Sequence, residues 1–222
     1  MSAGAIVVAA GSSTRMGSAG DKTLADIGGE PLIARTIDVF ERCDAIAAIA
    51  LVVSEGNRDA IAALRDNKGW HKTLPPLIGG ARRQDSVRAG LDALPPDCDW
   101  VLVHDGARPF VTPRMIEEGL AAAAATGAAI AVVPAFDTVK RIGEGGRVVE
   151  TLDRSELAMV QTPQVFRRDV LGRAHAEVMV DVTDDAAMVE RIGIEVRTFA
   201  GARSNIKVTT PEDLLIATAM LR

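Results

Sequence analysis

Aromatic residues and cysteines are scarce in this chain of 222 residues. Tyrosine is absent and aromatics make up 3% of the sequence, which argues against a platform on which single-stranded bases stack. Cys43 and Cys98 belong to no C-x-x-C pair, so the sequence indicates neither a disulfide framework nor a zinc site. We therefore expect a reduced, cytoplasmic location.

An excess of positive charge is also missing. The net charge of −5 gives no sign of binding to nucleic acid or to a membrane surface. The N-terminus lacks a basic segment, and its apolar run is too short for a signal peptide. The stretch 120–136 is mostly alanine but contains Thr126, Gly127 and Pro134, which favours helix, turn and strand over a membrane span. We expect neither nucleic acid nor a membrane as a partner.

The composition does supply a large aliphatic core. Hydrophobic residues make up 48% of the chain, enough for one domain spanning residues 1–222. Apolar runs predict strands over residues 5–10, 48–53, 77–79, 100–104, 128–133 and 195–199. Helical patterns lie between them, including 31–42, 82–94 and two helices that begin with Thr112-Pro113 and Thr210-Pro211. This alternation predicts an α/β fold with a mostly parallel sheet and helices on both faces.

The segment 137–160 interrupts this alternation. A glycine-rich turn at 143–146 separates two β-prone stretches, 138–142 and 147–152, which predicts a hairpin that leaves the main sheet. A lone two-stranded hairpin is only marginally stable in water. We therefore expect a second subunit to cover it, which would make it a dimerisation arm. The alternative is a hairpin folded back on its own domain.

The first predicted strand runs into a glycine-bounded basic loop. Its sequence, AAGSSTRMGSAGDK, matches neither the Walker A motif nor the dinucleotide fingerprint. Beginning at Ala10 and Gly11, the loop offers backbone N–H groups to an anion, and Arg15 and Lys22 add positive charge. It is typical of a nucleotide-phosphate site, although an ordinary turn with solvated cations is the alternative.

Polar residues also follow the third and fourth predicted strands, where an open α/β sheet binds its ligands. Glycines at 79 and 80 let the backbone approach a flat base, which Ser86 can hydrogen-bond. Asp105 can bind a substrate hydroxyl or help to hold Mg²⁺, and Arg108 can pair with a phosphate. The alternatives are a solvated Ser86, an Asp–Gly turn and a surface ion pair.

The second half of the chain carries further hydroxyls and cations. They are Thr138, Lys140, Arg154, Thr162 and Lys207. Each alone fits a solvated surface position, but together they suit a phosphate ester. For Asp184 and Asp185 we expect a helix-dipole role beside a Thr183 cap, and for Arg82 and Arg83 a partly solvated pair.

Several of these motifs occur together in one known order along nearly the whole chain. They are AAGSSTRMG, GGARRQDSV, HDGARPF, DTVKR, TPQVF, TDDAAMVE and NIKVTTPEDL. In this order they closely resemble the 2-C-methyl-D-erythritol 4-phosphate cytidylyltransferase family of the non-mevalonate isoprenoid pathway. The resemblance implies a three-layer, Rossmann-like nucleotidyltransferase fold, Mg²⁺ dependence and a homodimer joined by the arm. The implied reaction transfers CMP from CTP to 2-C-methyl-D-erythritol 4-phosphate and releases pyrophosphate.

The resemblance also implies roles for individual residues. The catalytic cations would be Arg15, Lys22 and Lys207. The CTP site would be formed by Ala10, Gly11, Gly80, Ala81, Ser86 and Asp105. The acceptor would meet Asp105, Arg108, Thr138, Thr162 and Lys207, together with Arg154 from the other subunit. Mg²⁺ would sit mainly on the CTP phosphates, with Asp105 as a candidate ligand. Some members carry an acidic residue where Ala81 stands, which leaves a side-chain contact to cytosine open there.

The implied mechanism is in-line attack by a phosphate oxygen on the α-phosphorus of CTP. Because that oxygen is already anionic, no general base is needed, and catalysis is positioning plus charge stabilisation. The alternatives are a ribitol 5-phosphate (pentitol) cytidylyltransferase, a molybdenum-cofactor nucleotidyltransferase and a silent nucleotide-binding module. Some members are fused to a downstream cyclase. Since this sequence ends at Arg222 after its last helix, we expect no cyclase activity.

Overall fold

A computed structural model describes residues 2–11 and 21–221 of the chain. The strands of the main sheet are β1 (Ala3–Ala9), β2 (Ile46–Val53), β3 (Leu77–Ile78), β4 (Trp100–Asp105), β5 (Ala128–Pro134), β8 (Ala158–Arg167) and β9 (Arg197–Ala200). The helices are α1 (Leu32–Arg42), α2 (Arg58–Lys68), α3 (Arg83–Ala93), α4 (Pro113–Ala123), α5 (Arg168–Glu177), α6 (Asp185–Arg191) and α7 (Pro211–Ala219). Short 3₁₀ turns are η2 (Glu55–Asn57), η3 (Glu144–Gly146) and η4 (Arg154–Glu156).

The main sheet has the strand order β3-β2-β1-β4-β8-β5-β9. β1 pairs in parallel with both β2 and β4, whereas β8 runs antiparallel between β4 and β5. The chain moves outward from β1 to β3 and then crosses to β4 on the other side of β1. Ligands of open α/β sheets bind at such a reversal, outside the carboxyl ends of the strands.

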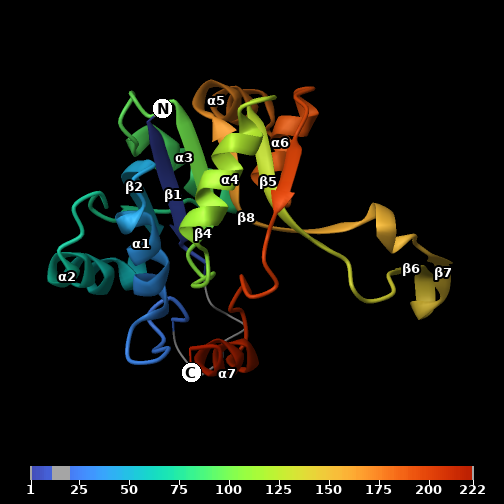
Figure 1. Cartoon of the computed structure of the whole chain (residues 1–222), viewed down its shortest axis with the longest axis horizontal. Coiled ribbons are helices and arrows are strands. Elements are labelled where there is room, and N and C mark those ends of the chain that lie inside the picture. The colour runs from blue at the N-terminus through green and yellow to red at the C-terminus, as the bar shows by residue number, and fades with distance from the viewer. Residues whose placement is uncertain (1, 12–20, 222) are drawn as a thin grey trace.

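Helices cover both faces of the sheet, which gives three layers (Figure 1). On one face, α1, α2 and α4 bury Ile37, Ile61 and Ile116 against the strands. On the other face, α3, α5 and α6 contribute a second core that includes Leu91 and Leu171. The aliphatic side chains that dominate the composition therefore fill two separate cores, which fix the strand ends in place. The expected three-layer α/β fold is confirmed.

Of the three threonines predicted to cap helices, two do so. The hydroxyls of Thr112 and Thr210 accept hydrogen bonds from backbone N–H groups in the first turns of α4 and α7. The prediction that Thr183 caps α6 is wrong. The cap is Asp184, whose carboxylate accepts from Ala187 N at 3.0 Å.

The predicted hairpin is present as β6 (Lys140–Ile142) and β7 (Val148–Thr151), which pair with each other in a separate sheet. Figure 1 shows it at the end of two long connections, projecting away from the three-layer body. Ile142, Val148 and Val149 on this arm are each more than half exposed. No helix within the described ranges has both the length and the apolar character needed to cross a membrane.

Candidate active site

A cavity of about 410 Å³ opens at the carboxyl ends of β1 and β4, where the strand order reverses. Its lining includes the end of β1, the glycine loop after β3 and two lysines from distant segments. These residues include Ala10, Gly11, Lys22, Gly80, Ala81, Arg82, Arg83, Ser86, Asp105 and Lys207. The cavity thus gathers Lys22, Lys207 and all of the residues predicted to bind CTP.

A second cavity of about 320 Å³ adjoins the first. Arg83, Asp105 and Lys207 line both cavities and form their shared wall. Its other lining residues include Arg108, Thr162, Gln164, Thr183 and Asp184. Two chambers that meet at a charged wall can hold two reactants with their reacting groups at that wall.

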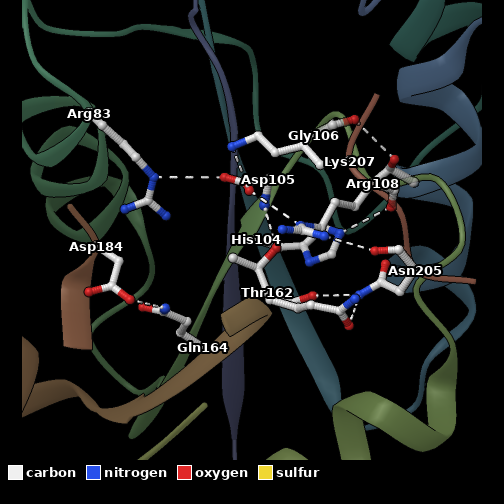
Figure 2. Close-up of polar contacts among 12 residues, drawn as sticks. Arg83, His104, Asp105, Gly106, Arg108, Thr162, Gln164, Asp184, Asn205 and Lys207 are labelled. Carbon is white, nitrogen blue, oxygen red and sulfur yellow. Dashed lines mark hydrogen bonds and ion pairs between the residues drawn. The ribbon is translucent and has the colours of Figure 1, made fainter. Parts of the chain in front are cut away.

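Asp105 is the centre of the shared wall (Figure 2). Its carboxylate lies 2.9 Å from Lys207 Nζ, 3.4 Å from Arg108 Nε and 3.7 Å from Arg83 Nε. Burial alone would raise the pKa of Asp105, but Lys207, Arg83 and Arg108 outweigh it and hold the pKa well below its usual range. The group is therefore a carboxylate that neutralises only part of the positive charge around it.

Backbone contacts fix the surroundings of Asp105. Its N–H donates to the hydroxyl of Thr162 at 3.0 Å, which joins β4 to β8. The buried side chain of Asn205 donates to Thr162 O at 2.8 Å, and Arg108 Nη1 donates to Asn205 O at 2.8 Å. These bonds attach the segment that carries Lys207 to β8 and to the loop after β4, as Figure 2 shows.

Glycine at position 79 brings the loop after β3 against the end of β1. A Cβ there would lie 2.5 Å from Ala10 Cβ and 2.6 Å from Ser86 Oγ, closer than real side chains approach. Ser86 is buried, and its hydroxyl accepts from Gly80 N at 3.2 Å and donates to Arg82 O at 3.3 Å. The hydroxyl therefore shapes the glycine loop, and the solvated alternative for Ser86 is wrong.

Lys22 lies on a segment that is anchored from η2. Asn57 is buried and donates to Asp21 Oδ2 at 2.5 Å and to Thr23 Oγ1 at 3.2 Å. Thr23 in turn donates through its N–H and its hydroxyl to Asp21 Oδ1. These bonds on both sides of Lys22 hold its backbone beside the first cavity.

His104 precedes Asp105 but faces the interior. Its ring packs on Phe40 with centroids 5.2 Å apart, and Nε2 lies 3.2 Å from Arg108 O. Burial lowers the pKa of His104 to about 4. The ring is therefore neutral at pH 7, donates through Nε2 to Arg108 O and supports the loop that carries Arg108.

The lowered pKa of His104 predicts that the stability of the fold depends on pH. The unfolded chain takes up a proton at His104 near pH 6.5, whereas the folded chain resists it down to about pH 4. Stability from this residue is complete above pH 6.5 and decreases as the pH falls towards 4, by about 3 kcal/mol in total. Urea unfolding between pH 7 and 4.5 should show a smaller loss for His104→Gln than for wild type. The same change at exposed His71 is the control, and an unchanged pH slope in His104→Gln would contradict this assignment.

Two predicted acceptor residues lie apart from both cavities. Thr138 is exposed at the base of the arm. Arg154, in η4, donates to Phe136 O and lines a separate hollow with Arg203. Arg15, predicted to be catalytic, lies outside the described residues. Within one chain, therefore, the described acceptor residues near Asp105 are Arg108, Thr162 and Lys207.

The structure brings three residues into the site for which the sequence predicts no site role. Arg83 was expected to be partly solvated, and Asp185 was expected only to complement a helix dipole. Instead, Arg83 forms part of the shared wall and donates to the fully buried Asp185 at 2.5 Å. Asn205 fixes the segment of Lys207. The only sequence signal was their place within the GGARRQDSV, TDDAAMVE and NIKVT segments, because residues so far apart in the chain show no local pattern.

The donor set can be tested against the Mg²⁺ that the family resemblance implies. Among residues 2–11 and 21–221, no group of three or more His, Cys, Asp or Glu side chains is placed to hold a metal. Asp105 supplies one carboxylate to the cavities. Mg²⁺ commonly binds through one or two carboxylates plus substrate phosphates. The residues therefore fit a Mg²⁺ ion held mainly by a nucleotide and not by a protein cage.

Comparison with known proteins agrees with the geometry. The profile of the family described as 2-C-methyl-D-erythritol 4-phosphate cytidylyltransferase matches residues 3–222. A protein of that name from Dehalococcoides mccartyi is 49% identical over 219 residues, which cover 99% of this chain and 96% of the relative. The crystal structure of a 4-diphosphocytidyl-2C-methyl-D-erythritol synthase from Anaerococcus prevotii superposes with a TM-score of 0.87 at 30% identity, covering 98% of this chain and 95% of the other. The Thermus thermophilus cytidylyltransferase gives a TM-score of 0.79 at 32% identity, covering 99% and 98%. The chain therefore belongs to the 2-C-methyl-D-erythritol 4-phosphate cytidylyltransferase family, as its motifs predicted.

Proposed function

We propose that this chain transfers CMP from CTP to 2-C-methyl-D-erythritol 4-phosphate, giving 4-diphosphocytidyl-2-C-methyl-D-erythritol and pyrophosphate. The observation that carries this proposal is the pair of adjoining cavities that share Arg83, Asp105 and Lys207. CTP occupies the cavity beside Gly80 and Lys22, and the acceptor occupies the cavity beside Arg108 and Thr162. Their reacting phosphates then meet at the shared wall. Family membership supports the choice of both substrates.

Each side chain has a role that follows from its charge and place. An oxygen of the acceptor phosphate attacks the α-phosphorus, the bond to the β-phosphate oxygen breaks, and pyrophosphate leaves with the electron pair. No proton has to be removed, since the attacking oxygen is already an anion. Lys22 and Lys207, together with Arg15, stabilise the charge on the transferring group. Asp105 receives the sugar hydroxyls and orients Lys207. Mg²⁺ held by the CTP phosphates, with Asp105 as a candidate ligand, supplies further charge neutralisation when bound.

We further propose that residues 1–222 form a single cytidylyltransferase domain whose arm, residues 137–160, joins two copies into a homodimer. The exposed aliphatic side chains of the arm support this assembly, because they gain burial only against another surface. Arg154 then completes the acceptor site of the other subunit, together with Thr138 on the arm. The acidic net charge and few cysteines are in keeping with a cytoplasmic enzyme that uses CTP and a polyol phosphate and binds no nucleic acid or membrane.

Turnover with a panel of acceptors tests the proposal. The purified protein is incubated with CTP and Mg²⁺, and pyrophosphate release is measured with 2-C-methyl-D-erythritol 4-phosphate and, separately, with ribitol 5-phosphate. We expect the former to react with by far the higher kcat/KM. Dominant activity on ribitol 5-phosphate would replace the proposal by the pentitol enzyme. Binding of CTP without turnover on either acceptor would indicate a silent nucleotide-binding module instead.

A further inference from the structure

Arg83 lines both cavities, and it belongs to the same side of the first cavity as the glycine loop. It is the first residue of α3, directly after the glycine loop, whereas Lys207 reaches the same wall from the far end of the chain. Figure 2 shows Nε of Arg83 facing the carboxylate of Asp105. The distance between Arg83 Nε and Asp105 Oδ1 is 3.7 Å, too long for a hydrogen bond. Because Arg83 lines both cavities, it lies beside the place where the proposed function brings the two phosphates together.

A buried carboxylate fixes this guanidinium from behind. Asp185, at the start of α6, is fully buried, and its Oδ2 accepts from Arg83 Nη1 at 2.5 Å. On the other side of the carboxylate, His175 Nε2 lies 3.9 Å from Asp185 Oδ1. A charge-assisted hydrogen bond to a fully buried carboxylate restricts the long arginine side chain strongly. Asp185 touches neither cavity, so its effect on a bound substrate has to pass through Arg83.

Arg83 lines both cavities and keeps donors that no described residue accepts. Among the described residues, the hydrogen bonds of its guanidinium reach only Asp185. Arg108, by contrast, uses Nη1 on Asn205 O and Nε on Asp105. Burial disfavours the charge of Arg83, but Asp185 and Asp105 outweigh burial and raise its pKa. The side chain is thus a permanent cation that has planar N–H donors available for phosphate oxygens.

We propose that Arg83 is a further catalytic residue, which binds phosphate oxygens at the junction of the two cavities, and that Asp185 is the residue that positions it. This inference rests on the proposed function, because it assigns the junction to the reacting phosphates. Two polyanions repel each other as they approach, and a fixed guanidinium lowers that cost without having to reorganise during the reaction. The neighbouring Arg82 differs, since it pairs with the solvent-facing carboxylates of Asp85 and Asp181.

A double-mutant cycle tests both parts of the inference. Arg83→Gln, Asp185→Asn and the double variant R83Q/D185N are compared with wild type for kcat and for the KM of each substrate. The double variant carries no unpaired buried charge, so it keeps the inference testable where Arg83→Gln alone folds poorly. Glu118→Gln on α4, an exposed partner of Arg114, is the control and should leave the kinetics unchanged. Thermal melting of each variant reports its folding.

The expected result is a kcat loss on the order of tenfold to a hundredfold for R83Q/D185N, the range typical of one charge-assisted hydrogen bond, with smaller changes in both KM values. Asp185→Asn should lower kcat in the wild-type background and have no further effect in the Arg83→Gln background. A double variant with wild-type kcat would overturn the role of Arg83. An equal loss from Asp185→Asn in both backgrounds would overturn its positioning role. If wild type itself forms no product from CTP and either acceptor, the proposed function fails. That outcome is distinct from a failure of the roles of Arg83 and Asp185, which requires an active wild type.

Discussion

Replacing Lys22 with alanine is expected to lower kcat by about 10²–10³-fold while changing the KM for CTP much less. Lys22 lines the cavity assigned to CTP, on a segment held by the buried side chain of Asn57. Negative charge grows on the transferring phosphoryl group as the new bond forms, so a fixed cation there stabilises the transition state more than bound CTP. The measurement is steady-state pyrophosphate release with both substrates varied.

A matched control separates this effect from a general loss of charge. Arg114→Ala removes one positive charge from an exposed position on α4 and should leave kcat and both KM values close to wild type. A rise in the KM for CTP with kcat unchanged in Lys22→Ala would contradict the catalytic assignment. Lys22 would then contribute uniform binding, equal in the ground state and the transition state.

Mixing inactive Arg154→Ala and Lys22→Ala homodimers should restore about a quarter of the wild-type activity after complete subunit exchange. Arg154 lies at the base of the projecting arm and lines neither of the two adjoining cavities in its own chain. If it completes the site of the other subunit, one site of each heterodimer carries both lesions and the other carries neither. The intact site then turns over at the wild-type rate.

Subunit exchange has to be demonstrated separately, for example by affinity capture of differently tagged chains. The matched control is a mixture of Lys22→Ala and Lys207→Ala. Both residues line the same cavity of one chain, so every site of this heterodimer keeps one lesion and no activity should return. Proven Lys22–Arg154 heterodimers that stay inactive would place Arg154 in its own subunit's site or outside any site. A chain that is monomeric at assay concentration would exclude the shared site altogether.

The parallel strands of the sheet were predictable because their signals are local. The apolar run that forms β1 ends in glycine, and the polar residues after β3 and β4 lie at strand ends, which parallel topology brings to one edge. Helix starts at Thr112 and Thr210 follow from hydroxyl capping, which depends on a few neighbouring residues.

The central strand β8 was not predicted, and its composition explains why. Gln161, Thr162, Pro163 and Gln164 interrupt its apolar residues, and proline is unusual inside a strand. The two glutamines are buried because distant groups satisfy them. Gln161 donates to Ala202 O at 2.9 Å, and Gln164 donates to Asp184 at 2.8 Å. A pattern based on hydrophobicity cannot detect partners that only the folded chain supplies.

The pair formed by Arg83 and Asp185 was misjudged for a related reason. In the sequence, each belongs to a short charged run that is typical of a solvated helix start. In the structure, α3 and α6 bring the two side chains together, and Asp185 has no exposed surface. A buried ion pair needs both partners at once, so neither run alone reveals it.

The position of β8 between β4 and β5 has a consequence for how the protein is made. During synthesis β4 emerges well before the strand that pairs with it, since Trp100–Val103 await Gln164–Arg167. At roughly 5–20 residues per second, the nascent chain presents an open apolar strand edge for several seconds. Such an edge is a template for pairing with other chains. A polypeptide cut before Ala158 keeps that edge permanently, so we expect such a fragment to aggregate. The length of the arm thus has a second effect, because it also sets how long the growing sheet stays open.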